Sequence, residues 1–213
     1  MENQSARIPE HLRPKNSGSD TLFKNGLVEK LSRTHISVPV TMHLIISVVV
    51  SYLALQRVSV VPFVILFVLG WVFWTFAEYW IHRYVYHVKT DKRWLLKIQH
   101  AGHGIHHQYP KDPTRLAMPP LPALILIAVF FGFFWLILRK LCHCFLPGFL
   151  FGYVLYISLH YAEHRYKAPK FGPLTRLWKL HMLHHYKYPE TKIFGVSELV
   201  LWDKIFGTMP LKE

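Results

Sequence analysis

Four apolar stretches divide the chain, and polar or basic segments separate them. The stretches are residues 38–55, 58–81, 121–138 and 145–159. A helix needs about 20 apolar residues to cross the ~30 Å hydrocarbon core of a bilayer, so the second stretch is clearly long enough and the first is marginal. The fourth is short, but a helix could continue through residue 164. Backbone polar groups in lipid must be paired within the protein, and no strand pattern here could close a barrel, so the stretches are predicted to be helices.

The linkers between these stretches predict how the helices pair. Arg57 alone separates the first two stretches, and residues 139–146 connect the last two. Each pair is therefore expected to form a tight hairpin. The predicted fold class is an all-α integral membrane protein with four transmembrane helices in two hairpins and a helical cap on one side of the membrane.

The segment before the first stretch, residues 1–37, is polar and basic and shows no cleavable signal pattern. Within it, apolar residues from Leu22 to Leu31 recur at helical spacing with lysine and arginine between them. This pattern predicts either a short amphipathic helix on the membrane surface or a partly disordered tail. The expected domain division is an N-terminal segment, 1–37, and a membrane-embedded domain, 38–213.

Basic residues predict the orientation of the chain in the membrane. Of the 25 lysines and arginines, six lie in residues 1–37, seven in 83–119 and nine in 165–213, whereas the two short turns hold one and two. Cytosolic segments of membrane proteins carry such an excess, so both termini and the central segment are predicted to be cytosolic. The membrane would be the endoplasmic reticulum in a eukaryote or the inner membrane in a bacterium.

The net charge of +13 also raises nucleic acid as a partner. The sequence contains no nucleic-acid-binding motif, however, and its basic residues flank apolar spans. Charged residues make up only 17% of the chain, whereas soluble domains have about 25%. Membrane lipids are therefore the expected partners of the basic surface, and nucleic acid is not.

Ten of the fifteen histidines are predicted to form one metal site at the cytosolic face. They follow the second span, lie in the central segment, end the fourth span, or lie in the C-terminal segment. This topology follows from the positions of lysine and arginine alone, and it places all ten histidines on the same side of the membrane. The ten are His82, His87, His103, His106, His107, His160, His164, His181, His184 and His185.

The spacing of these histidines is typical of metal ligands. Residues 103–107 and 181–185 both read H-x-x-H-H, and positions i, i+3 and i+4 share one face of a helix. His160 and His164 are also i, i+4 neighbours. His82 and His87 are five residues apart, so the helix is expected to end or loosen between them, unless they reach different metals.

Ten ligands exceed the capacity of one ion, whereas two ions with about five imidazoles each fit the count. Imidazole suits iron, zinc, copper and nickel. Structural zinc prefers four ligands and often takes thiolates, and none are placed here. An all-histidine site for two ions therefore favours oxygen-activating iron, although the sequence does not assign each histidine to an ion.

Other candidate residues receive plainer interpretations. Cys142 and Cys144 flank a histidine and are expected to lie in an interfacial turn; two cysteines also exclude a disulfide framework. The run His160-Tyr-Ala-Glu163-His164 matches the H-x-x-E-H pattern of zinc peptidases, but a peptidase would leave both H-x-x-H-H segments unexplained. A non-catalytic metal-binding membrane protein is a further alternative. Ordinary polar roles are expected for His11, His35, His43, His100 and His143.

Taken together, the motifs resemble those of the fatty acid hydroxylase superfamily, and within it the fatty acid 2-hydroxylases that act on sphingolipid acyl chains. The resemblance covers roughly residues 60–210. The matching segments are 78–83 with His87, then 103–107, 115–120, 152–156, 160–164, 181–185 and 201–208.

The resemblance implies that the ten histidines are the ligands of a di-iron centre, with zinc able to replace iron in purified protein. It also implies that dioxygen is the co-substrate and that a hydroxyl group is added to C2 of the acyl chain of a sphingolipid, a ceramide or a related lipid. A sibling oxygenase that hydroxylates or desaturates a sterol, a carotenoid or an alkyl lipid is the alternative. The Leu-Trp-Asp-Lys-Ile-Phe-Gly-Thr run at 201–208 favours the acyl hydroxylase.

Three acidic residues, Glu78, Glu163 and Asp203, lie beside the histidines or in a family motif. Metal-bound histidines need a partner for their second ring nitrogen, so these carboxylates are candidate partners. Ile157 stands where the family often has an aspartate, so that aspartate's role is not expected here. Many relatives carry an N-terminal cytochrome b5 domain, for which the first 37 residues are too few. Electrons are therefore expected from a separate carrier, either cytochrome b5-like or ferredoxin-like.

Overall fold

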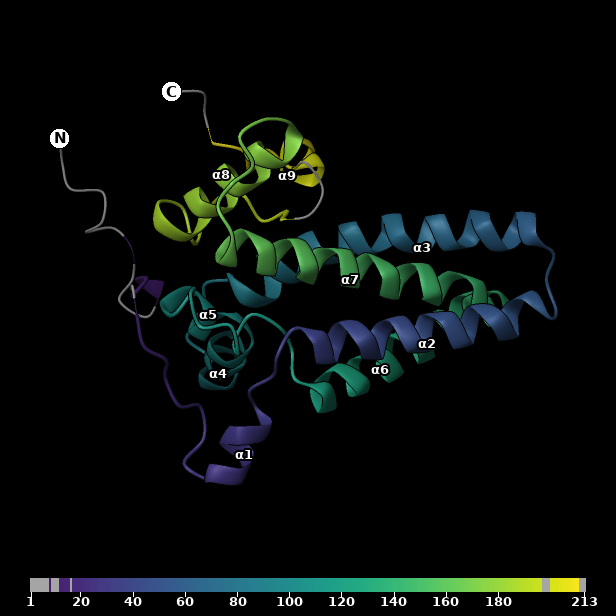
Figure 1. The fold of residues 1–213 in the computed structure, drawn as a ribbon, viewed down its shortest axis with the longest axis horizontal. Coiled ribbons are helices and arrows are strands. Elements are labelled where there is room, and N and C mark those ends of the chain that lie inside the picture. Colours follow the sequence, from purple (N-terminus) through teal and green to yellow (C-terminus); the bar gives the residue numbers. More distant parts are fainter. Residues whose placement is uncertain (1–7, 9–11, 16, 197–199, 211–213) are drawn as a thin grey trace.

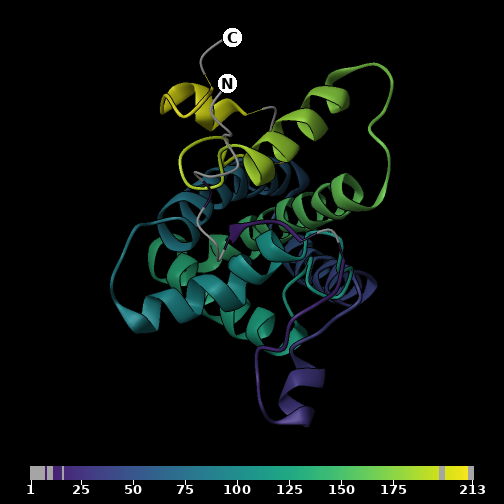
Figure 2. The same cartoon turned by 90° about the vertical axis from the view of Figure 1, so that its left-hand side faces the viewer.

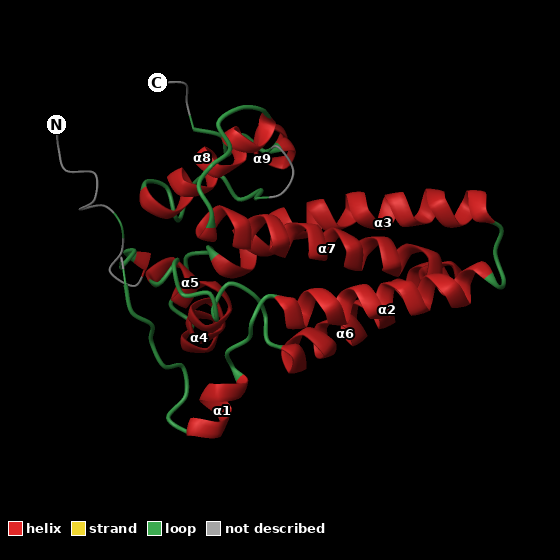
Figure 3. Ribbon diagram, in the orientation of Figure 1, coloured by secondary structure: helices red, strands yellow, loops and turns green. Residues whose placement is uncertain are grey.

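Helices make up all the regular structure of the described residues, and no strand occurs among them (Figure 3). The structure is a computed structural model that describes residues 8, 12–15, 17–196 and 200–210. The α-helices are α1 (Gly26–Leu31), α2 (Ser37–Leu55), α3 (Val60–Ile81), α4 (Arg93–Gln99), α5 (Ile105–Gln108), α6 (Pro120–Leu138), α7 (Cys142–Arg165), α8 (Pro173–Tyr186) and α9 (Leu201–Ile205). Two π-helical turns, η3 (His82–Tyr86) and η4 (His100–Gly104), and one 3₁₀ turn, η5 (Arg139–Leu141), join them.

The four long helices α2, α3, α6 and α7 form an elongated bundle (Figure 1). Connectivity pairs α2 with α3 and α6 with α7, as predicted. The broadest contacts of α7, however, are with α3 and α2 rather than with α6. Helix α7 therefore has many more buried residues than the other long helices. An apolar pattern predicts helices and hairpins, but it does not predict which helix lies at the centre.

Glycines allow α3 and α7 to approach closely. A Cβ atom placed on Gly148 of α7 would overlap the backbone carbonyl of Phe67, and one placed on Gly70 of α3 would overlap that of Phe145. Small residues at such contacts are typical of helix packing in membranes, where apolar burial provides little drive for association. The contact is completed by a core cluster of aromatic and apolar side chains around Trp74 and Phe149.

Three segments are long and apolar enough to cross a membrane: Ser37–Leu55, Val60–Tyr86 and Pro120–Arg165. The third contains both α6 and α7. Helices α2, α3 and α6 expose many large apolar side chains, as expected of surfaces that face lipid. The chain is thus a helical protein with membrane-spanning segments, and a separate fourth crossing by α7 stays a prediction.

Both predicted linkers differ from the structure in length. Helix α2 ends at Leu55 and α3 begins at Val60, so four residues rather than Arg57 alone form the first turn. Helix α7 begins at Cys142, so the second turn is only η5. The prediction that Cys142 and Cys144 lie in the turn was therefore wrong: they lie in the first turn of α7, and both are buried. The fourth helix does continue through residue 164, as expected.

The shorter helices gather at one end of the bundle (Figure 1). The segment with α4 and α5 lies on one side of this end and the segment with α8 and α9 on the other, as the turned view also shows (Figure 2). The second span enters this end through η3, and α7 enters it with its last turns. The arrangement brings these four segments of the chain together at one place.

Part of the N-terminal segment, residues 29–34, contacts residues 112–115, which follow α5, through ion pairs and a backbone hydrogen bond. We call this contact the N-terminal clasp. Glu29 of α1 forms an ion pair with the buried guanidinium of Arg115, and Arg33 pairs with Asp112 at 3.3 Å. The N–H of Thr34 also donates to the backbone carbonyl of Thr114. Helix α1 is capped by Asn25 and exposes apolar side chains. A helix therefore does form where the amphipathic pattern predicted one, and its place on a membrane surface stays a prediction.

Candidate metal centre

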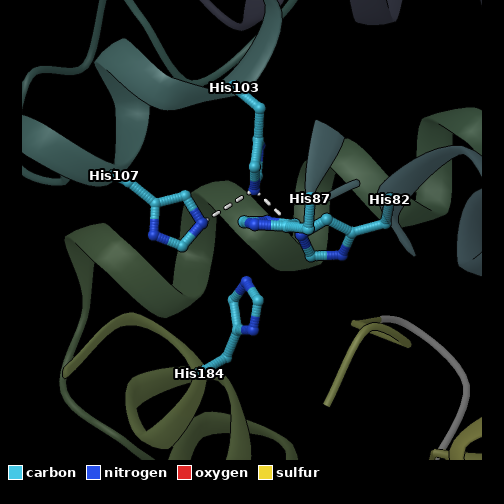
Figure 4. A group of neighbouring side chains, drawn as sticks. All are labelled: His82, His87, His103, His107 and His184. Atoms are coloured by element: carbon cyan, nitrogen blue, oxygen red, sulfur yellow. Dashed lines mark hydrogen bonds between the residues drawn. The ribbon is translucent and has the colours of Figure 1, made fainter. Parts of the chain in front are cut away.

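All ten predicted histidines meet in two groups of five. They lie on segments at the end of the bundle that carries α4, α5, α8 and α9, which we call the cap. Within each group, one nitrogen from each ring lies within 4.8 Å of one nitrogen from every other ring. Group one is His82, His87, His103, His107 and His184 (Figure 4). Group two is His106, His160, His164, His181 and His185.

The two H-x-x-H-H segments contribute to the groups in opposite ways. In the first segment, His103 and His107 join group one and His106 joins group two. In the second, His181 and His185 join group two and His184 joins group one. Each segment thus supplies an i, i+4 pair to one group and its remaining histidine to the other, which ties the two groups together.

A π-helical turn explains how His82 and His87 reach the same group. Helix α3 passes into η3 at His82, and η3 ends at Tyr86, directly before His87. A π turn makes i→i+5 hydrogen bonds and so places residues five apart on nearly the same side. The loosening expected between these histidines is therefore a widened turn. The spacing predicted one regular α-helix for the first H-x-x-H-H segment. The segment instead begins in the second π turn, η4, which includes His103, and continues into α5.

The spacing of the ring nitrogens fits metal ligands. In group one, His103 Nε2 lies 2.8 Å from His82 Nε2 and 3.0 Å from His107 Nε2. In group two, His106 Nε2 lies 2.9 Å from His160 Nε2 and 3.1 Å from His185 Nε2. A neutral ring nitrogen has either one proton or one lone pair, so it cannot form a full hydrogen bond to two such neighbours.

A cation at the centre of each group would account for these distances. Nitrogen ligands lie about 2.1 Å from a divalent ion, so two of them at right angles are about 3.0 Å apart, which is close to the observed separations. In addition, His184 Nε2 is buried with no hydrogen-bond partner among the described residues, and its ring points toward the other four rings (Figure 4). The residues present therefore fit two metal ions.

Backbone carbonyls fix the ring orientation of two group-one histidines. His82 Nδ1 donates to the carbonyl oxygen of Phe194 at 2.6 Å, and His184 Nδ1 donates to that of Lys192 at 3.0 Å. A neutral imidazole that carries its proton on Nδ1 has its lone pair on Nε2. Both lone pairs are therefore available inside the group.

Burial keeps the other rings neutral as well. Away from the membrane-spanning segments, burial lowers the pKa of six histidines of the centre, with neighbouring histidines adding to the effect at most of them; the pKa of His184 falls to about 4. The residues concerned are His103, His106, His107, His181, His184 and His185. Neutral imidazole is the form that binds metal, so the site needs no proton release at neutral pH.

The three candidate carboxylates lie close to the centre but make different contacts. Glu163 Oε2 lies 3.7 Å from His181 Nδ1, on the side of the ring away from the ligand nitrogen. Glu78 Oε1 accepts the N–H of Val196 at 2.8 Å. Asp203 accepts the N–H groups of Phe194 and Gly195. The last two carboxylates thus contact the loop that supports His82 and His184.

Sequence reasoning missed this loop. Lys192 and Phe194 contribute through their backbone carbonyls, which any residue provides, so no side-chain signal marked them. Phe194 also packs its ring against those of His82, His87 and His184. Thr208 lies at the end of the 201–208 motif and donates to Asp203 at 2.6 Å, but its residue type alone gave no hint of this role.

The remaining histidines lie outside both groups. His43 is buried in α2, where its Nδ1 donates to the carbonyl of Pro39 at 2.7 Å. His35 is exposed and His143 is partly buried, and both bond locally; His100 belongs to η4 without joining a group. His11 lies outside the described residues. The geometry thus separates the same ten histidines that the spacing selected.

Comparison with known proteins agrees with this arrangement. The sequence model of the family described as Fatty acid hydroxylase matches residues 67–208. A solved structure described as full-length Scs7p, with only the hydroxylase domain visible, superposes with a TM-score of 0.85 and 32% identity, covering 99% of this chain and 85% of that chain.

Curated relatives carry related names. A fatty acid 2-hydroxylase of Mus musculus is 40% identical over 154 residues, which is 71% of this chain and 41% of the relative. A dihydroceramide fatty acyl 2-hydroxylase of Arabidopsis thaliana is 37% identical over 142 residues, 64% of this chain and 57% of the relative. A ceramide very long chain fatty acid hydroxylase of Saccharomyces cerevisiae is 35% identical over 198 residues, 90% and 50%. The chain spans about half the length of these relatives.

Proposed function

The chain belongs to the fatty acid hydroxylase family, and from this premise we propose that it hydroxylates C2 of the acyl chain of a ceramide, a sphingolipid or a related lipid. The matched region, residues 67–208, falls within the domain that we assign to residues 38–213. One oxygen atom of dioxygen would enter the C–H bond, and the other would leave as water with two electrons and two protons. A separate carrier, cytochrome b5-like or ferredoxin-like, would supply the electrons.

The observation that carries this proposal is the pair of five-histidine groups. Each group offers five nitrogen donors, a number that one metal ion can accept. Imidazole suits iron, and two bound iron ions would supply the dioxygen activation that attack on an unactivated C–H bond requires. We propose that the ten histidines are the iron ligands, and zinc could occupy them in purified protein.

The protein's own part is to hold and shield the site. Nine of the ten histidines are at most 7% exposed, and His164 is only partly exposed, so bulk water is kept away from the reacting atoms. Helices α5, α7 and α8, together with η4 beside α5, carry eight of the ten histidines, and they meet at the end of the bundle where the shorter helices gather (Figure 1). We propose that the acyl tail lies among the helices while the polar head stays at the basic cap surface, and that the cap and both termini are cytosolic.

Two alternatives are less well supported. A zinc peptidase would use Glu163 as general base beside a metal, but its carboxylate lies behind the His181 ring rather than among the ligand nitrogens. A sibling oxygenase that acts on a sterol, a carotenoid or an alkyl lipid would use the same histidines. The relatives named above, which are fatty acid or ceramide hydroxylases, favour the acyl substrate.

The experiment that tests the proposal is lipid analysis in a host that lacks 2-hydroxy lipids, with an electron donor supplied. New 2-hydroxyacyl lipids are expected with the intact chain. They should be absent with His106→Ala, from group two, and with His184→Ala, from group one. His143→Ala, a histidine outside both groups, is the matched control and should retain the products. Unchanged host lipids with the intact, folded chain would refute the proposal.

A further inference from the structure

We infer that Asp203 is a positioning residue for group one alone, and that it acts through the backbone of residues 192–196. This inference rests on the proposed metal centre and adds that group one has a support of its own outside the segments that carry the histidines. Asp203 is fully buried in α9 and meets no histidine directly. Its effect on the metals therefore has to pass through the loop.

The loop contacts group one through two backbone carbonyls and one aromatic ring. It accepts hydrogen bonds from His82 through the carbonyl of Phe194 and from His184 through that of Lys192. The Phe194 ring covers three rings of the same group. The hydrogen bonds and ring contacts described for this loop reach no histidine of group two.

The loop has no helix or strand to satisfy its own N–H groups, so acceptors elsewhere do so. Ile193 donates to the backbone carbonyl of Thr208 at 3.1 Å. Phe194 and Gly195 donate to the two oxygens of Asp203 at 2.9 and 2.7 Å, and Val196 donates to Glu78 at 2.8 Å. One carboxylate thus holds the two central N–H groups of the loop, including that of the residue whose carbonyl orients His82.

The backbone needs this restraint, because Ile193 has a φ of 64°. A β-branched residue rarely adopts a positive φ, so surrounding contacts must hold it there. Val200, just before α9, has a φ of 56° as well. The strained segment is therefore tied to α9 by the carboxylate that α9 carries.

A chain of donors indicates that Asp203 acts as a carboxylate. Thr208 Oγ1 donates to Asp203 at 2.6 Å, so the contact of 3.1 Å between Tyr79 and Thr208 must be donated by the tyrosine. Arg83 in turn donates to the Tyr79 oxygen at 2.6 Å. Asparagine at position 203 would turn an NH₂ group toward one of these donors, and the loop would lose its hold on that side.

The test is the metal content of the full-length chain with Asp203→Asn, purified after iron-replete expression. Loss of an outer partner typically weakens metal binding by about 10–100-fold, so the ions per chain should fall from two toward one. Asp91→Asn, which changes an exposed aspartate away from the centre, is the matched control and should keep two. Adding His164→Ala, from group two, to Asp203→Asn should bring the content below one.

A second measurement separates positioning from general damage. Thr208→Val, which removes one donor to Asp203, should speed the release of one ion to a chelator and leave the other rate unchanged. If Asp203→Asn does not fold, this variant decides the matter.

The outcomes distinguish the inference from the proposed function. Retention of two ions by Asp203→Asn, or equal loss of both ions, would overturn the inference. An intact chain with two ions that makes no hydroxylated lipid would overturn the function and leave the inference standing. An intact chain that binds no metal would overturn both.

Discussion

The contact between α3 and α7 gives the sharpest prediction about stability. Gly148 has no space for a side chain, because a Cβ there would overlap the backbone carbonyl of Phe67. A backbone carbonyl cannot move away by a change of rotamer, as a side chain can. To restore an ordinary carbon–oxygen contact of about 3.3 Å, the two helices would have to separate by roughly 1.5 Å.

The expected cost of Gly148→Ala follows from two opposing effects. Overpacking of a tight contact costs about 1–3 kcal/mol, and the backbone neighbour places this case at the upper end. Alanine favours a helix over glycine by about 0.5–1 kcal/mol. The net loss is then about 1–2 kcal/mol, which for a chain of this length lowers the unfolding midpoint by about 2–8 °C.

The assay is thermal unfolding of the purified chain in detergent, followed by tryptophan fluorescence. Gly132→Ala is the matched control, because Gly132 lies in α6 and a Cβ added there would meet nothing within 4 Å. That variant should unfold at the same temperature or up to about 4 °C higher, since only the helix preference acts. Equal shifts of the same sign in both variants would show that α3 and α7 are not packed backbone to backbone.

Further predictions concern the metal centre and the N-terminal clasp. Phe194→Ala should weaken metal retention in group one, because the rings of His82, His87 and His184 lose their contact with Phe194. The rate of ion release to a chelator measures this, and an unchanged rate would count against the packing role. Partial burial of Glu29 opposes its charge, but the N–H groups of Leu22 and Phe23 and the nearby arginines outweigh it and lower its pKa. A lowered carboxylate pKa stabilises the fold above the ordinary value of about 4.3 and is lost as the pH falls through the folded value. The protection of the Thr34 N–H against hydrogen exchange, taken relative to the intrinsic rate at each pH, should therefore be high at pH 6 and fall below about pH 4, and it should be lower in Glu29→Gln than in the intact chain at pH 6. Protection at Thr34 that stays the same from about pH 6 to below about pH 4 would contradict the clasp.

Much of the site was predictable because its chemistry lies in side chains with strict spacing. The ten histidines were selected by i, i+3 and i+4 positions and by their place after predicted spans, and the structure brings the same ten together. Their division into two groups was not predictable. It depends on α7 and α8 facing α5, and the H-x-x-H-H segments look alike in sequence although they serve the groups in opposite ways.

The parts that escaped prediction depend on backbone and tertiary contacts. The π turn at His82 leaves no clear mark on an apolar pattern. The support from Phe194 and Lys192 comes from their carbonyl oxygens, which no residue type reveals. Likewise, the central position of α7 follows from close contacts at Gly70 and Gly148, and apolar periodicity does not distinguish a glycine at a helix contact from one in open space, such as Gly132.

The measurement that tests the central claim most directly is mass spectrometry of ceramides formed under ¹⁸O₂ by the intact chain with a working electron donor. The account predicts a new hydroxyl group on C2 of the acyl chain that carries ¹⁸O, and its absence with His106→Ala. A hydroxyl group without the label, or no hydroxylated product from a chain that binds two iron ions, would contradict the account.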